Sequence, residues 1–462
     1  MYPALSSILY TLQSFQTSFI IFHSRRLLST LFCENRQRNN LWFIWKMSIF
    51  KWTSPLFFIQ NFLFESTNFC FSHRVSTGPI RQGGLSPIPN EIYTEIFNHL
   101  RPLDINPWID SVYRRDFSRV ALVCRFFCSV MLPWIFESME FTGKNQNGSL
   151  NHTPFCRSII RGCESARTVA TFVKRCSFSD WIENEFPPSW YNTEFQILYS
   201  KALAFMPNVE ELKLTKTSIN KYMLKSILGL KCLTSLSLDL SPIQVGAVKA
   251  KDIRKLSTLR LKRLRFYENG PYDDGDNTSL ISQAICLDSL LVVHTNHWPL
   301  VARIAEQNCN LPLQELDIFV AKDVGLLPKI FQKTPALEKL RISMAADLKH
   351  VQFGGVLPAL DELCCPLFLL QSLVPKRPIS SINTVTSYVS LMEITVSPSL
   401  FKKSTCKIRS LCVPIHDYMT IPFWEHFPDL KSLRLKYAPT APTHFICAQK
   451  VFAKLLLHQV KF

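Results

Sequence analysis

The chain has 462 residues, of which 47% are hydrophobic and 19% charged; this length and composition allow two or three globular domains and exclude wholesale disorder. Its 15 cysteines are scattered without regular spacing, so we expect reduced thiols and a cytoplasmic or nuclear location. Residues 1–84 hold eight basic and two acidic residues and so supply +6 of the net charge of +17, while acids and bases interleave in the remainder, which argues against nucleic acid as a partner.

Residues 1–84 are rich in Phe, Trp, Ser and Thr and show no sustained helical or strand period. Their most apolar stretch, 5–22, is interrupted by Ser, Thr and Gln, whereas a membrane-spanning helix needs about 20 mostly apolar residues. Three explanations remain open: a poorly ordered tail, a targeting segment, or upstream sequence wrongly included, with the true start at Met47 or later. We expect this segment to add nothing to the fold.

Residues 85–141 read as a compact helical unit, with Pro89 in the first turn of a helix, where its missing N–H costs nothing. The apolar stripe of that helix consists of Ile92, Ile96, Phe97 and Leu100. After a connection at 104–117, a second helix is predicted from the apolar residues Val120, Leu122, Val123, Phe126, Phe127 and Val130. This second arc is wider than a small domain needs for its own core, so the surplus apolar surface indicates a docking partner.

A repeated pattern occupies the chain beyond about residue 165. Each copy has an apolar residue, two others, a second apolar residue, one other, and a third apolar residue. The copies are Val209/Leu212/Leu214, Leu233/Leu236/Leu238, Leu261/Leu264/Phe266, Leu287/Leu290/Val292, Leu313/Leu316/Ile318, Leu337/Leu340/Ile342, Leu360/Leu363/Cys365, Ile408/Leu411/Val413 and Leu430/Leu433/Leu435. Val173/Cys176/Phe178 is a divergent first copy, and either Ile382/Val385 or Leu391/Ile394/Val396 fills the one wide gap. Steps of roughly 22 to 28 residues are typical of leucine-rich repeats.

Each triplet predicts a short strand of a parallel sheet, with the apolar side chains pointing inward. Helices such as 220–230 and 298–308 cover the inner face, and stacked repeats share one core. The expected fold class is thus α+β or α/β repeat, with a linker and first repeat region at 142–200, a solenoid over 201–440 and a capping helix over 441–462. The copies lack the asparagine that follows the strand in regular leucine-rich repeats, so we expect an irregular solenoid without an asparagine ladder.

The polar residues between the apolar positions are expected to face outward: Lys213, Ser237, Arg265, Asp317, Arg341 and Arg434. A basic strip at 251–265 is where an acidic or phosphorylated partner is first expected, although we favour the simpler view that it is the polar face of one repeat. The candidate substrate-facing residues are Arg263, Arg265, Asp317, Arg341 and Arg434.

The helical unit resembles the F-box family. The matching runs are Ile88-Pro89-x-Glu91-Ile92-x-x-x-Ile96-Phe97-x-x-Leu100 for the first helix, Leu122-Val123-Cys124-Arg125-x-Phe127 for the second and Trp134-Ile135-Phe136 for the third. The resemblance implies a three-helix module over 85–141 that docks on the Skp-type adaptor of a cullin ubiquitin ligase. It places at the adaptor Ile88, Pro89, Glu91, Ile92, Ile96, Phe97, Leu122, Val123 and Cys124. The connection at 104–117 is longer than is usual in the family.

The helical unit and the repeats together resemble, over roughly residues 85–440, the F-box receptors with leucine-rich repeats that are abundant in mushroom-forming fungi. The resemblance implies a substrate-recognition subunit of an SCF-type (Skp–cullin–F-box) E3 ubiquitin ligase, whose repeat horseshoe holds an unidentified protein target. The implied partners are the adaptor, the cullin ligase core and that target; a membrane is not expected. The alternative is a non-catalytic repeat scaffold or binding protein without a ligase role, with or without membrane association through its N-terminus.

Catalytic motifs are missing from the sequence. It contains no glycine-rich phosphate loop, no Gly-x-Ser-x-Gly elbow and no His-Glu-x-x-His zinc helix. We therefore expect a chain that is not itself an enzyme and has no cofactor or metal site.

Overall fold

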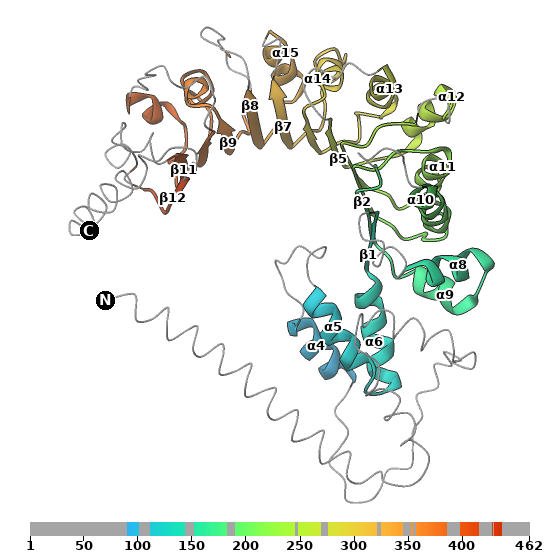
Figure 1. The fold of residues 1–462 in the computed structure, drawn as a ribbon. Coiled ribbons are helices and arrows are strands. Elements are labelled where there is room, and N and C mark those ends of the chain that lie inside the picture. The colour runs from blue at the N-terminus through green and yellow to red at the C-terminus, as the bar shows by residue number, and fades with distance from the viewer. Residues whose placement is uncertain are drawn as a thin grey trace, which may run out of the picture. The chain divides into compact units, whose positions relative to one another are not determined.

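The computed structural model of the chain describes residues 90–100, 111–143, 152–182, 190–244, 248–268, 276–320, 325–344, 357–385, 398–414 and 429–436, with Phe353 and Phe427 (Figure 1). The N-terminal segment 1–84 and the capping helix expected over 441–462 lie outside these residues. So do Ile88, Pro89 and the alternative repeat copy Leu391/Ile394/Val396.

Three helices form the helical unit: α4 (Asn90–Leu100), α5 (Ser111–Ala121) and α6 (Arg125–Phe136). Aromatic rings join α4 to α6, since Phe97 and Tyr93 both meet the ring of Phe127 edge-on, with centroids 5.2 Å and 5.3 Å away. On α5, Phe117 contacts Trp134 of α6 at 5.5 Å. Such tilted ring pairs add about 0.5–1.5 kcal/mol each beyond the burial of their area. The small unit therefore has an aromatic core.

The predicted second helix is wrong in its bounds. The chain leaves the helical conformation after Ala121, and Cys124 has an extended backbone with φ −158° and ψ 168°. Its Sγ accepts a hydrogen bond from the N–H of Phe127 at 3.4 Å and so caps α6. The predicted connection at 104–117 is also too long, because α5 begins at Ser111. The break covers only residues 122–124, and because Leu122 and Val123 are themselves apolar it does not interrupt the apolar pattern, so it was not predicted.

The described residues beyond α6 form one parallel sheet of 12 strands, ordered as in the chain (Figure 1). The strands are β1 (Ser138–Thr142), β2 (Arg175–Ser179), β3 (Glu211–Thr215), β4 (Ser235–Asp239), β5 (Arg263–Tyr267), β6 (Val292–Thr295), β7 (Glu315–Val320), β8 (Lys339–Met344), β9 (Glu362–Cys365), β10 (Ser381–Thr384), β11 (Ser410–Pro414) and β12 (Ser432–Lys436). Every interior strand pairs with the strands before and after it in sequence, which makes the sheet a solenoid. The expected α/β repeat is confirmed.

Helices connect the strands and cover one side of the sheet (Figure 1). They are α8 (Thr153–Arg161), α9 (Glu164–Ala170), α10 (Trp190–Leu203), α11 (Lys221–Gly229), α12 (Ala250–Ile253), α13 (Asp276–Ala284), α14 (Trp298–Ala305), α15 (Leu326–Lys333) and α16 (Leu370–Leu373), with the 3-10 helices η2 (Arg254–Thr258), η3 (Leu367–Leu369) and η4 (Pro398–Lys403). The helices predicted over 220–230 and 298–308 are α11 and α14. None of the helices that the structure describes is long and apolar enough to cross a membrane.

The apolar triplets predict the strand phase, with two exceptions. In a regular copy, Leu212 of β3 is buried beside its register partner Leu236 of β4. In β6 the buried triplet is Leu290/Val293/Thr295 instead of Leu287/Leu290/Val292, because Val293 pairs with Leu316. In the wide gap the predicted pair Ile382/Val385 is out of phase: Ile382 of β10 pairs with Leu363 and is the second apolar position, so the buried triplet is Ile379/Ile382/Thr384. In both strands a buried threonine takes an inward position, so a search for apolar residues alone misplaces the strand.

Two further features were not predicted. The sheet begins one strand before the first predicted copy, at β1, where Met139 and Phe141 are buried. Ser237, expected to face solvent, is only 8% exposed. Its register neighbours are Lys213 and Arg265, and their long side chains rise on either side of a short one.

Buried hydroxyl groups follow the strands where regular leucine-rich repeats carry asparagine. The Oγ1 of Thr217 donates to the carbonyl of Phe178 at 3.2 Å. The backbone N–H of Thr217 donates to Ser241 Oγ at 3.2 Å. Ser241 Oγ in turn donates to the carbonyl of Asp239 at 3.0 Å. Because each buried backbone group must find a partner, these hydroxyls hold three successive repeats in register.

Buried aromatic rings mark the start of the solenoid. Phe141 of β1 is fully buried, with ring centroids 4.9 Å from Phe178 of β2 and 4.7 Å from Tyr199 of α10. The hydroxyl of Tyr199 hydrogen-bonds Thr153 of α8 at 2.8 Å, and Trp181 Nε1 donates to the carbonyl of Phe141 at 2.9 Å. The cluster thus joins the first two strands to the first helices.

Polar contacts join the helical unit to this end of the sheet. Arg114 of α5 donates from Nη2 to the carbonyl of Ser138 at 2.6 Å. Glu137, between α6 and β1, accepts the N–H of Arg175 at its carbonyl (2.9 Å), and its carboxylate pairs with Arg175 Nη2 at 3.1 Å. Helical unit and sheet are therefore connected by more than the chain itself.

We expect stability to depend on pH through His152. Burial, with a smaller contribution from the positive charge of Arg114, lowers the pKa of His152 from 6.5 to about 4. Below pH 6.5 the unfolded chain takes up a proton that the folded chain excludes, so the free energy of unfolding should fall towards pH 4, by about 1.4 kcal/mol per pH unit at the steepest. Urea denaturation over this range measures the slope. His152→Phe, which keeps a ring against Phe141, should flatten it, and an equal slope in the variant would contradict the assignment.

The N-cap of α11 gives a smaller prediction. The Oδ1 of Asn220 accepts hydrogen bonds from the N–H groups of Tyr222 and Met223, both at 2.9 Å. Asn220→Ala removes both bonds at a residue only 6% exposed, so we expect a loss of about 1–2 kcal/mol in the free energy of unfolding. Chemical denaturation measures this loss. Asn220→Asp, which keeps the acceptor, should lose much less.

Candidate functional site

Large apolar side chains are exposed on the helical unit. Ile92 and Ile96 of α4 are 50% and 47% exposed, and Leu122 and Val123 of the α5–α6 turn are 39% and 53% exposed. In the described part of the chain only one other large hydrophobic residue is exposed, Phe205 at 37%. We call the first four residues the apolar helical surface.

Local structure explains why these side chains point to solvent. Ile92 and Ile96 are one helical turn apart and share a face of α4, while Tyr93 and Phe97, on the adjoining side of the helix, pack against α6. The turn before α6 displays Leu122 and Val123 because the chain leaves α5 just before them. The aromatic core therefore holds both exposed pairs on adjoining elements.

The remaining predicted adaptor-facing residues divide into three groups. Glu91 and Cys124 are exposed, and Cys124 is also the cap of α6. Phe97 differs from the prediction, since it is only 7% exposed and serves the aromatic core. Ile88 and Pro89 lie outside the described residues. A half-exposed apolar surface of this kind can bind a partner by burying area, at about 25 cal/mol per Å².

A second candidate surface is the side of the sheet away from the helices. The strand register aligns one row of outward residues across it: Glu140, Ser177, Lys213, Ser237, Arg265, His294, Asp317, Arg341, Cys364, Asn383, Cys412 and Arg434. We call it the central row. It holds four of the five predicted substrate-facing residues, and Arg263 lies in the adjacent row with Glu315, Lys339 and Glu362.

Ion pairs link neighbouring strands along these two rows. Arg341 Nη1 lies 3.5 Å from Asp317 Oδ2, and its Nε donates to Cys364 Sγ at 3.4 Å. Lys339 Nζ lies 2.8 Å from Glu362 Oε1. The cations of β8 are therefore neutralised by acids of the strands on either side.

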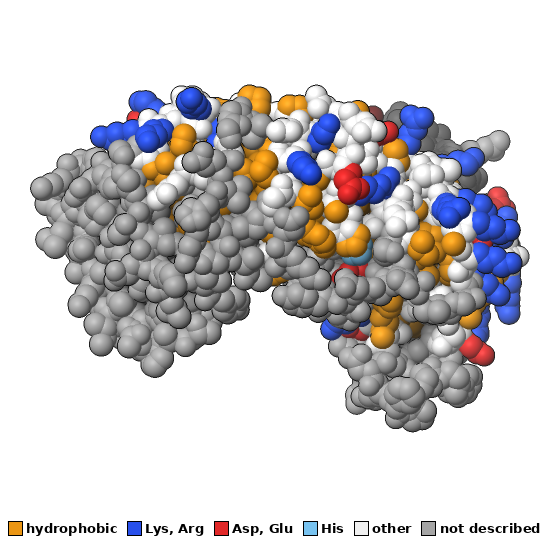
Figure 2. Space-filling model, turned by 90° about the horizontal axis from the view of Figure 1, so that it is seen from above, with side chains coloured by type: hydrophobic (Ala, Val, Ile, Leu, Met, Phe, Trp, Pro, Cys, Tyr) orange, Lys and Arg blue, Asp and Glu red, His pale blue; other side chains and the backbone are white. Residues whose placement is uncertain are grey.

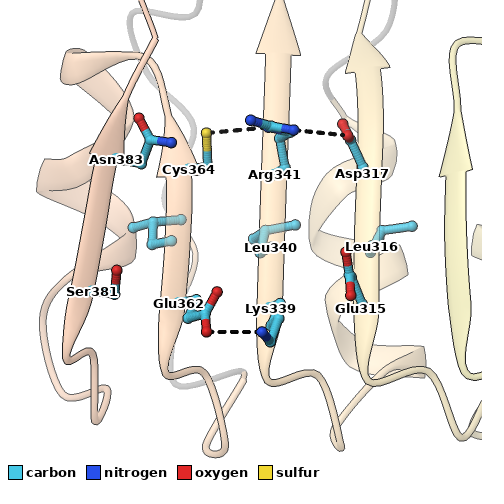
Figure 3. A pocket seen from close by; sticks show the side chains of 11 residues that line it. Glu315, Leu316, Asp317, Lys339, Leu340, Arg341, Glu362, Cys364, Ser381 and Asn383 are labelled. Carbon is cyan, nitrogen blue, oxygen red and sulfur yellow. Dashed lines mark hydrogen bonds and ion pairs between the residues drawn. The ribbon is translucent and has the colours of Figure 1, made fainter. Parts of the chain in front are cut away.

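These residues line a hollow of about 250 Å³ that spans β7 to β10 (Figure 3). Figure 3 shows Arg341 between Asp317 and Cys364, and Lys339 beside Glu362, with Asn383 at the far end. The strand segments at Leu316, Leu340 and Leu363, whose side chains are buried, form its floor, and charged and amide groups form its rim. A hollow with these groups can hold polar side chains of an extended segment, because each strand offers an outward residue every second position.

The electrostatics of the sheet face change the pKa of two groups. Burial raises the pKa of Asp317, against the opposing effects of Arg341 and His294. Burial, with the negative charge of Asp317, raises the pKa of Tyr267 to about 12. Tyr267 therefore stays protonated and available as a hydrogen-bond donor at any physiological pH.

Several residues of the sheet face were missed by reasoning from sequence. His294 was hidden by the misplaced triplet of β6, which put Leu291 in the outward position. Its Nε2 lies 2.9 Å from Glu315 Oε1. Lys339 and Glu362 precede the apolar residues of their strands, and the strand phase alone would have found them. Cys364 and Asn383 were not selected as candidates because only charged residues were considered.

The helix side of the molecule has a different character. Helices α8, α11, η2, α15 and η4 each carry two basic residues and no acidic one. Figure 2 shows Lys and Arg side chains spread over the face it views, with few Asp or Glu. Within the described residues, no three His, Cys, Asp or Glu side chains are grouped to hold a metal ion.

Comparison with protein-family models finds none that matches the chain, and comparison with curated proteins finds no match either.

Proposed function

We propose that the chain is an F-box protein with leucine-rich repeats, acting as the substrate receptor of an SCF-type ubiquitin ligase. The helical unit docks on the Skp-type adaptor, and the sheet face of the repeats binds the target protein. The receptor contributes no chemistry of its own; it raises the effective concentration of the target near the ubiquitin-loaded enzyme.

The observation that carries the proposal is the apolar helical surface. Ile92, Ile96, Leu122 and Val123 were assigned to an adaptor on the F-box resemblance alone. Among the described residues they are also four of the five large apolar side chains most open to solvent. A protein that exposes such groups on a small helical unit gains stability when a partner covers them.

The second support is the arrangement of the two surfaces in the chain. The helical unit runs directly into β1 through α6, and Arg114 and Glu137 reinforce that junction. A docking element joined in this way to a recognition solenoid is what a receptor requires, because slack between them would lower the effective concentration of the target.

The test is co-expression of the full chain with a fungal Skp-type adaptor, followed by affinity purification through the adaptor. We expect a stable complex that elutes together in size-exclusion chromatography, and recruitment of a cullin to it. Failure of the folded chain to bind the adaptor would overturn the proposal. Binding of the adaptor without cullin recruitment would instead favour the repeat scaffold without a ligase role.

A further inference from the structure

The fold separates charges that are mixed along the sequence. Acidic residues such as Glu211, Glu315 and Asp317 lie on the strands, in the outward rows of the sheet. On the other side of the sheet, helices α10, α11, α12 and η2 carry six Lys or Arg residues and two acidic residues. Helix α10 packs on α11, and α11 packs on η2, so these charges share one surface (Figure 2). Folding thus concentrates positive charge on the helix side.

Most of these cations have no acidic partner. Lys255 is the exception, because its Nζ lies 2.7 Å from Asp252 Oδ1. The second acid, Glu194, lies about two turns before Lys201 on α10 and forms no ion pair with a described residue. Five exposed cations remain that form no ion pair with any described residue: Lys201, Lys221, Lys225, Lys251 and Arg254. We call these five residues the basic helix surface.

Like charges are crowded within this surface. Lys201 Nζ of α10 and Lys221 Nζ of α11 lie over the same ring, that of Tyr222, at 4.7 Å and 5.0 Å from its centroid, so the two charges are no farther apart than the sum, 9.7 Å. Lys225 follows Lys221 by one helical turn, a spacing at which like charges destabilise a helix. Lys221 is also the first residue of α11, where the positive end of the helix dipole adds to its charge. An anion bound here relieves all of this repulsion.

The composition of the surface favours a lipid headgroup layer over nucleic acid. Four of its five cations are lysines, whereas arginine, with its planar fork of donors, is the usual residue for nucleic-acid recognition. Cations already lie over the ring of Tyr222 and, at 5.4 Å, over that of Phe205, where a protein of single-stranded nucleic acid stacks bases. The five cations also come from different helices without a regular spacing. Lipids diffuse in their plane and gather beneath such charges, while the phosphates of a nucleic acid are fixed along its strand.

We propose that the basic helix surface binds the anionic surface of a lipid bilayer, with lipid phosphates and carboxylates as counter-charges. The cations are on long exposed side chains, so the association is peripheral, reversible and weakened by salt. It requires no spanning helix, and it differs from the sequence-based expectation that a membrane is not a partner. The inference does not depend on the ligase role.

Vesicle sedimentation with the full chain tests the inference. Vesicles of phosphatidylcholine alone are compared with vesicles of equal parts of phosphatidylcholine and phosphatidylserine. We expect the chain to sediment with the anionic vesicles, to stay in solution with the neutral ones, and to be released by added salt. Equal binding to both kinds of vesicle, or binding to neither, overturns the proposal.

Charge neutralisation then locates the contact. Each basic residue at an anionic surface contributes a factor of about five in partitioning, so Lys221→Gln with Lys225→Gln should lower binding roughly 25-fold. The matched control, Lys213→Gln with Arg434→Gln, removes the same charge from the sheet face and should lower binding far less. Residues 1–84 are identical in all three proteins, so their charge does not contribute to the difference. Equal losses in the two double variants contradict the proposal, provided that circular dichroism shows equal folding.

Nucleic acid is the competing polyanion. Filter binding of the same proteins to single-stranded RNA and to duplex DNA, at the ionic strength of the vesicle experiment, measures this competition. We expect weaker binding per anionic group than to phosphatidylserine vesicles. A tighter complex with nucleic acid that the Lys221/Lys225 variant loses would assign the surface to nucleic acid and overturn the membrane proposal.

Discussion

Replacing Ile96 and Val123 together by aspartate should abolish co-purification with the adaptor while leaving the fold intact. The two side chains are 47% and 53% exposed, so the change removes little buried area from the free chain. In a complex, each carboxylate would enter an apolar contact without a partner, which costs several kcal/mol. We expect affinity for the adaptor to fall at least roughly 100-fold, equivalent to about 2.7 kcal/mol.

Phe205→Asp is the matched control for this prediction. Phe205 is the other exposed large apolar side chain of the described residues, at 37%, and it lies after α10 beside the guanidinium of Arg167. This variant should bind the adaptor like the wild type. Thermal unfolding of all three proteins checks that folding is unchanged. Full adaptor binding by the double variant would show that the apolar helical surface is not the docking site.

Phe141→Ala should cause the largest loss of stability. The ring is fully buried and contacts Phe178 and Tyr199 at centroid distances of 4.9 Å and 4.7 Å. Removing a buried phenylalanine side chain costs about 3–5 kcal/mol, because the cavity it leaves closes only in part. Urea denaturation followed by circular dichroism should show a lower midpoint, or an early separate transition of the first repeats.

The comparison for that experiment is Phe141→Leu, which keeps much of the volume and should lose clearly less than the alanine variant. Phe205→Ala, at an exposed site, should lose little. Equal small losses for both Phe141 variants would contradict the central place of this ring in the first repeats.

Leucine spacing predicts most of the strands because each copy buries its apolar residues in the same order. The prediction fails where a polar residue takes an inward position, as Thr295 does in β6 and Thr384 in β10. An apolar residue outside the strand, such as Leu287, then shifts the phase. Strand β1 was missed because its sequence was taken as the end of the helical unit.

The candidate surfaces were predictable to different degrees. The pattern of α4 placed Ile96 and Phe97 in one apolar stripe, and the packing of Tyr93 and Phe97 against α6 decides that Phe97 is buried and Ile96 exposed. Cross-strand pairs such as Arg341 with Asp317 depend on which strands become neighbours and on the register between them. No single strand contains that information, so the charged hollow emerged only from the assembled sheet.

Because the strands lie in chain order, each repeat adds the same distance along the solenoid. Six strand steps separate β1, beside the helical unit, from β7, where the hollow begins. Insertion or loss of one strand–helix unit between them shifts the hollow by one strand spacing, about 4.8 Å. The ion pairs within the hollow stay intact. The distance from the apolar helical surface to the hollow can thus be lengthened or shortened in discrete increments, without a change at either end.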